Sequence, residues 1–411
     1  MAAVDRTVSG LAYLDHASTT PIRPEAFAAL TAELAQTGNA SSLHSAGRRA
    51  RRIVEESRES VAASLGVRPS DVVFTSGGTE SDNLAIKGLY WSRVTEDPRQ
   101  STILISSIEH HAVLDAADWL ARHEGALVVR FPVDRCGRVD PAVVQEHLDR
   151  HVGSIALVSV MWANNETGIV QPVAEIAVAC ATAGVPLHCD GVQAVAWLPS
   201  PGSWSSAPGA LSVSGHKVGG PVGVGALVLT DVEVQPLLHG GGQELDIRSG
   251  TLMTAQIASM AVALRAATRQ REVAAPAIAR LRDDLIGRMA ELVPDAVLTG
   301  GGSEPTLPGI AQFWFPGCEA DTLLMLLDAA GIECSAGSAC TAGVSQPSHV
   351  LLAMGLDPAS ARGALRFSLG WTSSLADIDV LMSALPEVVA RARRSGDRQR
   401  ARLHSSGTGV N

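Results

Sequence analysis

Lysine is nearly absent from this sequence. Lys87 and Lys217 are the only lysines among the 411 residues. The chain has 32 lysines and arginines in total, and all the others are arginine. A guanidinium stays protonated in proteins, whereas a lysine amine in a suitable pocket can lose its proton and form a Schiff base. A biased coding composition would also explain the scarcity of lysine. Whether a lysine has a functional role must therefore be judged from the residues around it. Lys87 follows an apolar stretch near an expected helix end, where a surface cation is favourable, whereas Lys217 lies between an apolar run and a glycine-rich segment.

Cysteine is also scarce, and it is scattered. Six cysteines in a chain of this length are too few for a disulfide framework, and no pair has the CxxC spacing of a structural zinc site. We therefore expect no disulfide framework and no metal. Cys180 lies in an apolar helical pattern, where a small buried thiol is expected. The full set is Cys136, Cys180, Cys189, Cys318, Cys334 and Cys340.

Long apolar runs and a net positive charge are absent as well. No apolar stretch approaches the length of a membrane span, and residues 1–6 lack the basic and then apolar order of a secretory signal. The formal net charge of −10 argues against a nucleic-acid binder. We expect a soluble cytoplasmic protein with no membrane and no direct nucleic-acid partner. The exception is an arginine-rich C-terminal segment, expected to be a helix end that frays or, alternatively, a docking segment for an acidic partner: Arg391, Arg393, Arg394, Arg398, Arg400 and Arg402.

The order of the segments predicts an α/β fold. With 46% hydrophobic and 18% charged residues, the chain can bury a large core and is expected to form two domains. Residues 112–124 have a helical apolar face, with Gly125 as the expected cap. Short β-branched runs alternate with such helical patterns, which predicts a mostly parallel sheet covered on both faces. The seven expected strands are residues 72–74, 102–105, 127–129, 155–160, 185–188, 211–213 and 225–229.

The pattern changes after Gly240–Gly242. Long helices rich in alanine, leucine and arginine continue to about Leu292, and mixed segments follow to the end. This predicts a second, smaller α+β domain. The expected division is a large domain of residues 21–268 and a small domain of residues 1–20 and 269–411. A long helix, not a flexible linker, is expected near residues 260–270, because no stretch rich in proline, glycine or serine interrupts it.

Two segments carry groups that fit a phosphorylated ring cofactor. Residues 74–84 read as a strand end, a glycine turn and a helix start, whose free N–H groups can cradle a phosphate. The same pattern is also common at strand-to-helix turns of α/β proteins that bind no phosphate. Asp190 lies just past an apolar strand and could pair with the pyridine nitrogen of pyridoxal phosphate (PLP), making the ring an electron sink. An aspartate at this position can equally cap the next helix. Gln193 could donate to the phenolate oxygen.

Together with others, these segments resemble the cysteine desulfurases, a PLP-dependent transferase family of fold type I, the aspartate-aminotransferase fold. The resemblance covers nearly the whole chain. It is closest to the branch with a long mobile cysteine loop, which serves iron–sulfur cluster assembly and tRNA thiolation. The eight matching segments, in order, are Tyr13–Pro21, Ser76–Asn83, Glu109–Val113, Asn164–Gly168, Ser214–Lys217, Arg248–Thr251, Gly337–Thr341 and Arg366–Gly370.

The resemblance implies a role for each matching residue. Lys217 would hold PLP as a Schiff base, Asp190 would pair with the pyridine nitrogen, Gln193 would contact the phenolate oxygen, and His110 would stack on the ring. The substrate carboxylate would be gripped by Asn165, which also belongs to the cofactor site, and by the two-pronged guanidinium of Arg366. The phosphate would be held by Gly78, Thr79, Ser214 and His216, joined by Thr251 from the other subunit of a homodimer.

Cys340 would complete the reaction. It lies in a small, glycine-punctuated segment, residues 335–343, so the loop should be mobile and the thiol reachable. By resemblance, Cys340 takes the sulfur of L-cysteine as a persulfide, alanine leaves, and the sulfur passes to an acceptor protein such as a cluster scaffold, a thiolase or a sulfur carrier. Cys334, beside Ile332, is expected to be packed or structural, with a secondary thiol role as the alternative. Two departures from the family pattern, Gly191 for alanine and Thr167 for a branched aliphatic residue, bear on substrate preference only.

Three other functions remain open at this point. A selenocysteine lyase or a class V aminotransferase could use the same scaffold, although an aminotransferase has no use for a thiol in a mobile loop. The third alternative is a non-enzymatic sulfur-relay scaffold. In it, PLP would be mostly structural and the arginine-rich segment would recruit partners. Assaying alanine against keto-acid production separates an aminotransferase from a desulfurase, and a scaffold would turn over free cysteine only with a partner present.

Overall fold

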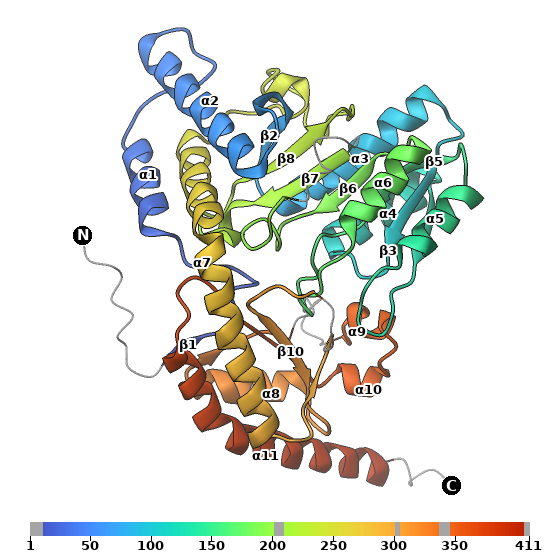
Figure 1. Cartoon of the computed structure of the whole chain (residues 1–411), viewed down its shortest axis with the longest axis vertical. Coiled ribbons are helices and arrows are strands. Elements are labelled where there is room, and N and C mark those ends of the chain that lie inside the picture. Colours follow the sequence, from blue (N-terminus) through green and yellow to red (C-terminus); the bar gives the residue numbers. More distant parts are fainter. Residues whose placement is uncertain (1–10, 201–208, 301–304, 337–345, 407–411) are drawn as a thin grey trace.

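The computed structural model describes residues 11–200, 209–300, 305–336 and 346–406. Two units lie one beyond the other along the long axis of the molecule, and helix α7 (Thr254–Leu292) runs along both (Figure 1). The larger unit holds the main sheet, and the smaller one holds the C-terminal strands and helices.

The main sheet confirms the predicted seven-stranded, mostly parallel architecture. Its strand order is β2-β8-β7-β6-β5-β3-β4, and β8 alone is antiparallel to both of its neighbours, β2 and β7. The strands from β7 through β4 pair in parallel, with one register shift between β3 and β5 at Thr102 and Ile103. The strands are β2 (Val72–Thr75), β3 (Thr102–Ser106), β4 (Leu127–Phe131), β5 (Ile155–Ser159), β6 (Leu187–Asp190), β7 (Gly209–Ser214) and β8 (Gly225–Thr230).

Helices cover both faces of this sheet, as a parallel sheet requires. Alternate residues of one strand serve the two faces: Ile103 and Ile105 pack in one buried cluster and Leu104 in the other. The first cluster is closed by α3 (Gly78–Glu96) and α4 (His111–Glu124). The second is closed mainly by α1 (Pro24–Leu34), α2 (Ser45–Leu65), α5 (Pro141–Arg150), α6 (Val173–Ala183) and the first half of α7.

Local sequence signals predicted one helix end correctly and another wrongly. Gly125, with φ of +74°, caps α4 as predicted, because glycine adopts the left-handed conformation without a steric cost. Cys180 is buried in α6, also as predicted. The placement of Lys87 near a helix end is wrong, because α3 continues past Gly88 to Glu96. The Lys87 amine instead lies over the ring of Trp119, 4.7 Å from its centroid.

The smaller unit is α+β. A three-stranded antiparallel sheet has the order β12-β10-β9 and packs against α8 and α11. The short parallel pair β1–β11 ties the first described residues to this unit. The elements are β1 (Ala12–Tyr13), β9 (Val297–Leu298), β10 (Ile310–Trp314), α8 (Ala320–Asp328), β11 (Ile332–Glu333), α9 (His349–Ala353), α10 (Pro358–Ala361), β12 (Ala364–Ser368) and α11 (Leu375–Ser406).

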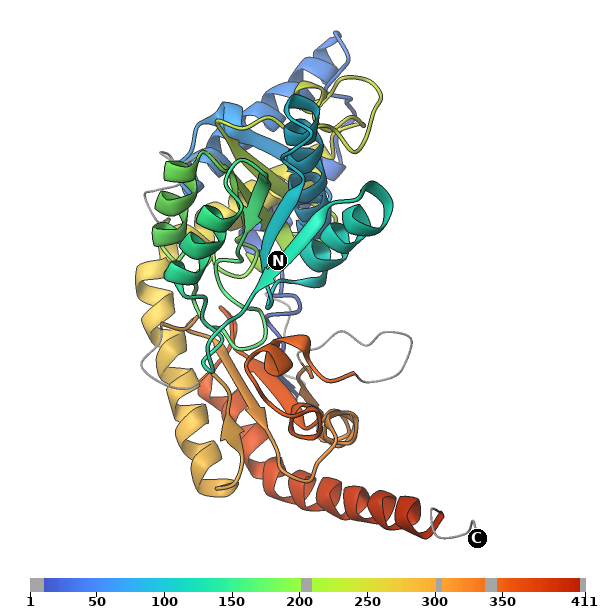
Figure 2. The same cartoon turned by 90° about the vertical axis from the view of Figure 1, so that its right-hand side faces the viewer.

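Helix α7 joins the two units and confirms the predicted long helix. Met260 and Leu264 pack into the core beside the main sheet, whereas Leu285 and Met289 pack into the core of the smaller unit. At the C-terminus, helix α11 continues through the arginine-rich segment to Ser406, so the segment expected to fray is helical (Figure 2). None of the described helices combines the length and apolarity needed to cross a bilayer.

Candidate active site

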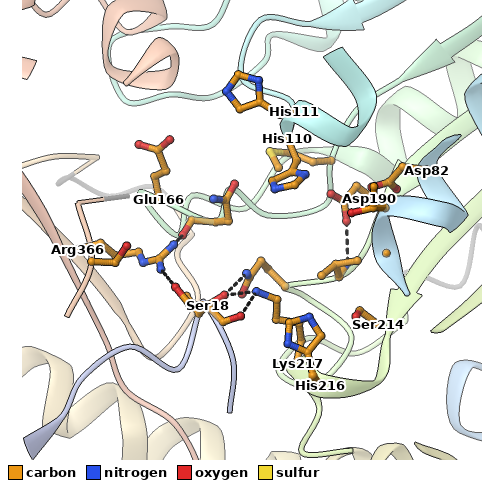
Figure 3. A pocket seen from close by; sticks show the side chains of 18 of the residues that line it. Ser18, Asp82, His110, His111, Glu166, Asp190, Ser214, His216, Lys217 and Arg366 are labelled. Carbon is orange, nitrogen blue, oxygen red and sulfur yellow. Dashed lines mark hydrogen bonds between the residues drawn. The ribbon is translucent and has the colours of Figure 1, made fainter. Parts of the chain in front are cut away.

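A cavity of about 400 Å³ lies where the two units meet. It opens at the carboxyl ends of the parallel strands β6 and β7, the edge at which open α/β sheets bind ligands. The smaller unit closes it with Ser335 and Arg366 (Figure 3). The residues predicted from the sequence that line this cavity are Gly78, Thr79, His110, Asn165, Asp190, Gln193, Ser214, His216, Lys217 and Arg366.

Lys217 ends a tight turn, Gly215–Lys217, that directly follows β7. Its amine donates to the carbonyl oxygens of Ser18, at 2.7 Å, and Ala17. Burial, and next the nearby Arg366 guanidinium, lower the pKa of Lys217 to about 8. A useful fraction of the amine is therefore uncharged near neutral pH, which a nucleophilic lysine requires.

Asp190 is the last residue of β6 and is buried. One carboxylate oxygen accepts the N–H of Val192 at 2.9 Å, as the capping alternative anticipates, yet the side chain also lines the cavity. Burial raises the pKa of Asp190 to about 6, and the charge of Asp82 contributes in the same direction. The group stays largely ionised at neutral pH and presents an anion to the cavity.

The N-terminus of α3 offers the expected anion cradle. Among the described residues no side chain caps this helix, so the N–H groups of its first turn face the cavity beside Thr79. A Cβ atom on Gly78 would lie 2.9 Å from Val192 Cγ2, so only glycine leaves this room. Ser214 and His216 line the cavity nearby, and burial lowers the pKa of His216 to about 4, which leaves it neutral.

His110 caps the other helix at the cavity, α4. Its Nδ1 accepts the Ala112 N–H at 3.2 Å, which fixes the ring orientation. Burial lowers the pKa of His110, so the imidazole is mainly neutral. Figure 3 shows His110 across the cavity from Lys217. Gln193 also lines the cavity and donates to the Ala17 carbonyl oxygen at 2.8 Å.

Arg366 comes from β12 of the smaller unit and is nearly fully buried. Its guanidinium donates to the Asn165 carbonyl at 2.8 Å, to Asp15 Oδ1 at 2.9 Å and to Ser18 Oγ at 2.7 Å. Its Nε has no hydrogen-bond partner within the described chain. A buried cation beside Asn165 is suited to a carboxylate ligand.

Several residues of the site had received no role from the sequence. Asp15, Ser18, Asp82 and Glu166 lie in segments that carried the family resemblance, so their positions were marked although their contacts were not. Their roles depend on contacts over long sequence separations, for example Arg366 with Asp15. His349 of α9 also lines the cavity, and its Nε2–H donates to the Glu109 carbonyl oxygen, 2.9 Å away; no sequence signal marked it.

Three other positions were singled out from the sequence, namely Thr251, Cys340 and Cys334. Thr251 is exposed and does not line the cavity, so any phosphate contact from Thr251 requires another copy of the chain. Cys340 lies outside the described residues. Cys334 is described: it packs against the core of the smaller unit, and burial raises its pKa to about 12. Cys334 is therefore an unreactive thiol at neutral pH.

The two departures from the family pattern are accommodated locally. A Cβ atom on Gly191 would lie 2.6 Å from Leu211 Cδ1, so the leucine side chain fills the space that an alanine would need. Thr167 is buried, and its hydroxyl donates to Asn164 Oδ1 at 3.3 Å. Neither change removes a polar group from the cavity.

These features fit PLP. The cavity volume is in the range of cofactor pockets. It combines an uncapped helix N-terminus for a phosphate, an amine of lowered pKa for an aldehyde, and a buried carboxylate for a ring nitrogen. These three groups differ in chemistry, yet all of them face the same cavity. A chance cluster of polar residues would not combine them in this way.

Comparisons with known proteins agree with this fit. The family model described as aminotransferase class-V matches residues 12–381. An IscS-like cysteine desulfurase of Mycobacterium tuberculosis is 54% identical over 386 residues, which cover 94% of this chain and 98% of that protein. A solved structure titled NifS-like protein is similar with a TM-score of 0.84 and 32% identity, covering 92% of this chain and 99% of the other. Another, titled SspA in complex with cysteine, has a TM-score of 0.74 and 31% identity, covering 87% and 98%.

The relative and the two solved structures cover 87–94% of this chain, and the residues matched by the family model include the cavity residues from both units. The chain therefore belongs to the class-V aminotransferase family and, within that family, to the cysteine desulfurases, which are PLP-dependent enzymes.

Proposed function

We propose that this chain converts L-cysteine to L-alanine in the cavity around Lys217 and passes the sulfur, held as a persulfide on Cys340, to an acceptor protein. The observation that carries the proposal is the joint presence of the Lys217 amine, the buried Asp190 carboxylate and the Arg366 guanidinium around one space. The similarity to a structure whose title records a complex with cysteine supports the choice of substrate.

Each side chain has a task that follows from its surroundings. Arg366 and Asn165 bind the substrate carboxylate, and the lowered pKa of Lys217 lets its amine bind the cofactor and then move a proton at Cα of the substrate. Asp190 holds the proton of the ring nitrogen, and the neutral His110 ring packs on the cofactor. PLP, when bound, supplies the electron sink that makes the Cα proton acidic and weakens the bond to the β-substituent.

Sulfur transfer is assigned to Cys340. Its thiolate attacks the substrate sulfur, the Cβ–S bond breaks with its electron pair on carbon, and that carbon takes up a proton to become the methyl group of alanine. Both flanks of the segment that carries Cys340 begin at the cavity, because Ser335 and His349 line it.

Further proposals concern the assembly, the partners and the domain division. A homodimer would let Thr251 contribute to the phosphate site of its partner, since it does not reach the cavity of its own subunit. We propose an acceptor in iron–sulfur cluster assembly or tRNA thiolation; a cytoplasmic location and the lack of a nucleic-acid partner remain predictions from the sequence.

The domain division 21–268 against 1–20 plus 269–411 is supported by the β1–β11 pair and by the separate buried clusters.

The test separates cofactor binding from sulfur transfer. Borohydride reduction and peptide mapping should find PLP on Lys217, and Lys217→Arg should lose both the linkage and turnover. Cys340→Ala should keep the PLP absorption and its change on adding cysteine but lose sulfide release. Sulfide release by Cys340→Ala at the wild-type rate would refute the persulfide role, and production of a keto acid in place of alanine would favour an aminotransferase.

A further inference from the structure

A chain of buried polar groups lies directly behind Asp190. His188 precedes Asp190 by two residues on β6, so the two side chains point to the same face of the sheet. His188 is fully buried; its Nδ1 lies 2.9 Å from Ser159 Oγ of β5 and its Nε2 lies 3.0 Å from Ser212 Oγ of β7. The Ser212 hydroxyl also hydrogen-bonds to Asp82 of α3. Four neighbouring elements thus contribute to a chain that ends at a second carboxylate.

The hydrogen bonds along this chain have one consistent direction. Burial lowers the pKa of His188 to about 4, so its imidazole is neutral in neutral solution. Ser212 has a single proton, which it donates to the Asp82 carboxylate, so its oxygen accepts the Nε2–H of His188. The Nδ1 of His188 then accepts the hydroxyl proton of Ser159. Every donor in the chain points toward Asp82.

Asp82 itself is poorly compensated for a buried acid. It is 2% exposed and lines the cavity. Its Oδ1 has no hydrogen-bond partner among the described residues. The ionisable group within ion-pair distance of this oxygen is His188, whose Nε2 lies 3.5 Å away. No described arginine or lysine forms a salt bridge with it. Burying a carboxylate in this way is unfavourable for folding, so stability does not explain it.

We propose that Asp82 is a positioning residue for the reaction, acting behind Asp190 as a second buried carboxylate that helps to hold the proton on the ring nitrogen of PLP. The inference rests on the proposed function, in which Asp190 faces that nitrogen. Figure 3 shows Asp82 and Asp190 on the same side of the cavity. Asp82 does not need to touch the ring, because charges interact over longer distances inside a protein than in water.

The other charged groups around Asp190 do not replace Asp82. Glu109, in the turn before α4, has its pKa raised to about 8 by burial, so it is mainly protonated at neutral pH. His110 and His188 are mainly neutral because burial lowers their pKa values. Lys217 is engaged by the cofactor. Asp82, whose pKa burial raises to about 7, is thus the remaining acid that ionises in the working range.

The test follows the ring nitrogen directly in the holoenzyme. Protein is reconstituted with PLP labelled with ¹⁵N in the ring, and the ¹⁵N resonance is recorded against pH for the wild type and Asp82→Asn. The nitrogen should lose its proton at a pH lower by on the order of one unit in Asp82→Asn. Ser212→Ala, which keeps Asp82 but removes the hydroxyl that favours its charge, should shift the titration in the same direction by less.

Glu166→Gln is the matched control. It also removes a buried carboxylate from the lining of the cavity, but on the side of Arg366, where Glu166 accepts from Ser348 and Gln312. The ring-nitrogen titration should be unchanged in this variant. Borohydride mapping of every variant reports whether PLP is still linked to Lys217.

The outcomes are distinguishable. If PLP is linked to Lys217 and neither Asp82→Asn nor Ser212→Ala shifts the titration, the role of Asp82 is refuted while the proposed function stands. An equal shift in Glu166→Gln would refute it too, because any carboxylate in the lining would then act alike. If wild-type protein carries no PLP on Lys217, the proposed function fails and this inference fails with it.

Discussion

Glu109 should make the cofactor-free protein less stable as the pH rises. Its side chain is fully buried: Oε1 accepts the Ser106 hydroxyl at 2.5 Å and the Met161 N–H at 2.8 Å, while Oε2 has no partner in the described chain. Burial raises the pKa of Glu109 from 4.5 to about 8, and the charges of Asp190 and Asp82 add to the shift. The folded protein therefore keeps a proton that the unfolded chain releases.

The sign and size of the effect follow from proton linkage. Between the unfolded and folded pKa values, from 4.5 to about 8, the folded state binds more protons than the unfolded state, so the free energy of unfolding falls as pH rises. Between about pH 6 and about pH 8, this one group lowers the free energy of unfolding by roughly 2 kcal/mol. Below the unfolded pKa both states are protonated and the group contributes no slope.

Glu109→Gln isolates this contribution. The amide oxygen can still accept from Ser106 and Met161, and the titration is gone. Urea unfolding of the cofactor-free protein at about pH 6 and about pH 8 should show a wild-type loss of stability that exceeds that of Glu109→Gln by roughly 2 kcal/mol. Opposing contributions from His188 and His216, whose pKa values are lowered by burial, cancel in this comparison. Glu291→Gln, on an exposed part of α7, is the control. An identical pH dependence in wild type and Glu109→Gln would refute the reasoning.

Three further predictions test other parts of the site. Arg366→Lys should raise KM for L-cysteine at least about tenfold with a smaller change in kcat, because an ammonium cannot reproduce the planar donor set; an unchanged KM in steady-state assays would exclude the carboxylate contact. Gly191→Ala should lower stability by about 1 kcal/mol because its Cβ would lie 2.6 Å from Leu211 Cδ1, and adding Leu211→Val should restore the melting temperature if this clash is the cause. Thr251→Val should weaken PLP retention in equilibrium dialysis without changing the dimer seen by ultracentrifugation, whereas normal retention would argue against a contact across subunits.

The fold was predictable because its signals are local. The seven strands of the main sheet appear as separate β-branched runs, and the alternation with helical patterns leaves little choice but a mostly parallel sheet. The cap at Gly125 and the uninterrupted α7 follow from the same kind of signal. Lys87 shows the limit: an apolar stretch followed by a charge resembles a helix end, but continued packing of α3 on α4 carries the helix onward.

The site was predictable only in part, since much of its chemistry depends on residues far apart in the chain. The motifs identified Lys217, Asp190 and Arg366, because each lies in a segment with a family pattern. The chain from Ser159 through His188 to Asp82 could not be predicted, because it depends on which strands are neighbours and on complete burial. Likewise, the contact of Arg366 with Asp15 joins residues 351 positions apart.

The two lysines now separate on physical grounds. An arginine could make the contact of Lys87 with Trp119 equally well, so the structure gives no reason why that position is a lysine. Position 217 is different, because burial and the Arg366 charge bring its amine to a pKa of about 8, whereas a guanidinium in the same place would stay charged and could not bond to an aldehyde. In a chain that uses arginine almost everywhere else, the requirement for a removable proton is therefore a sufficient reason for lysine at this one position.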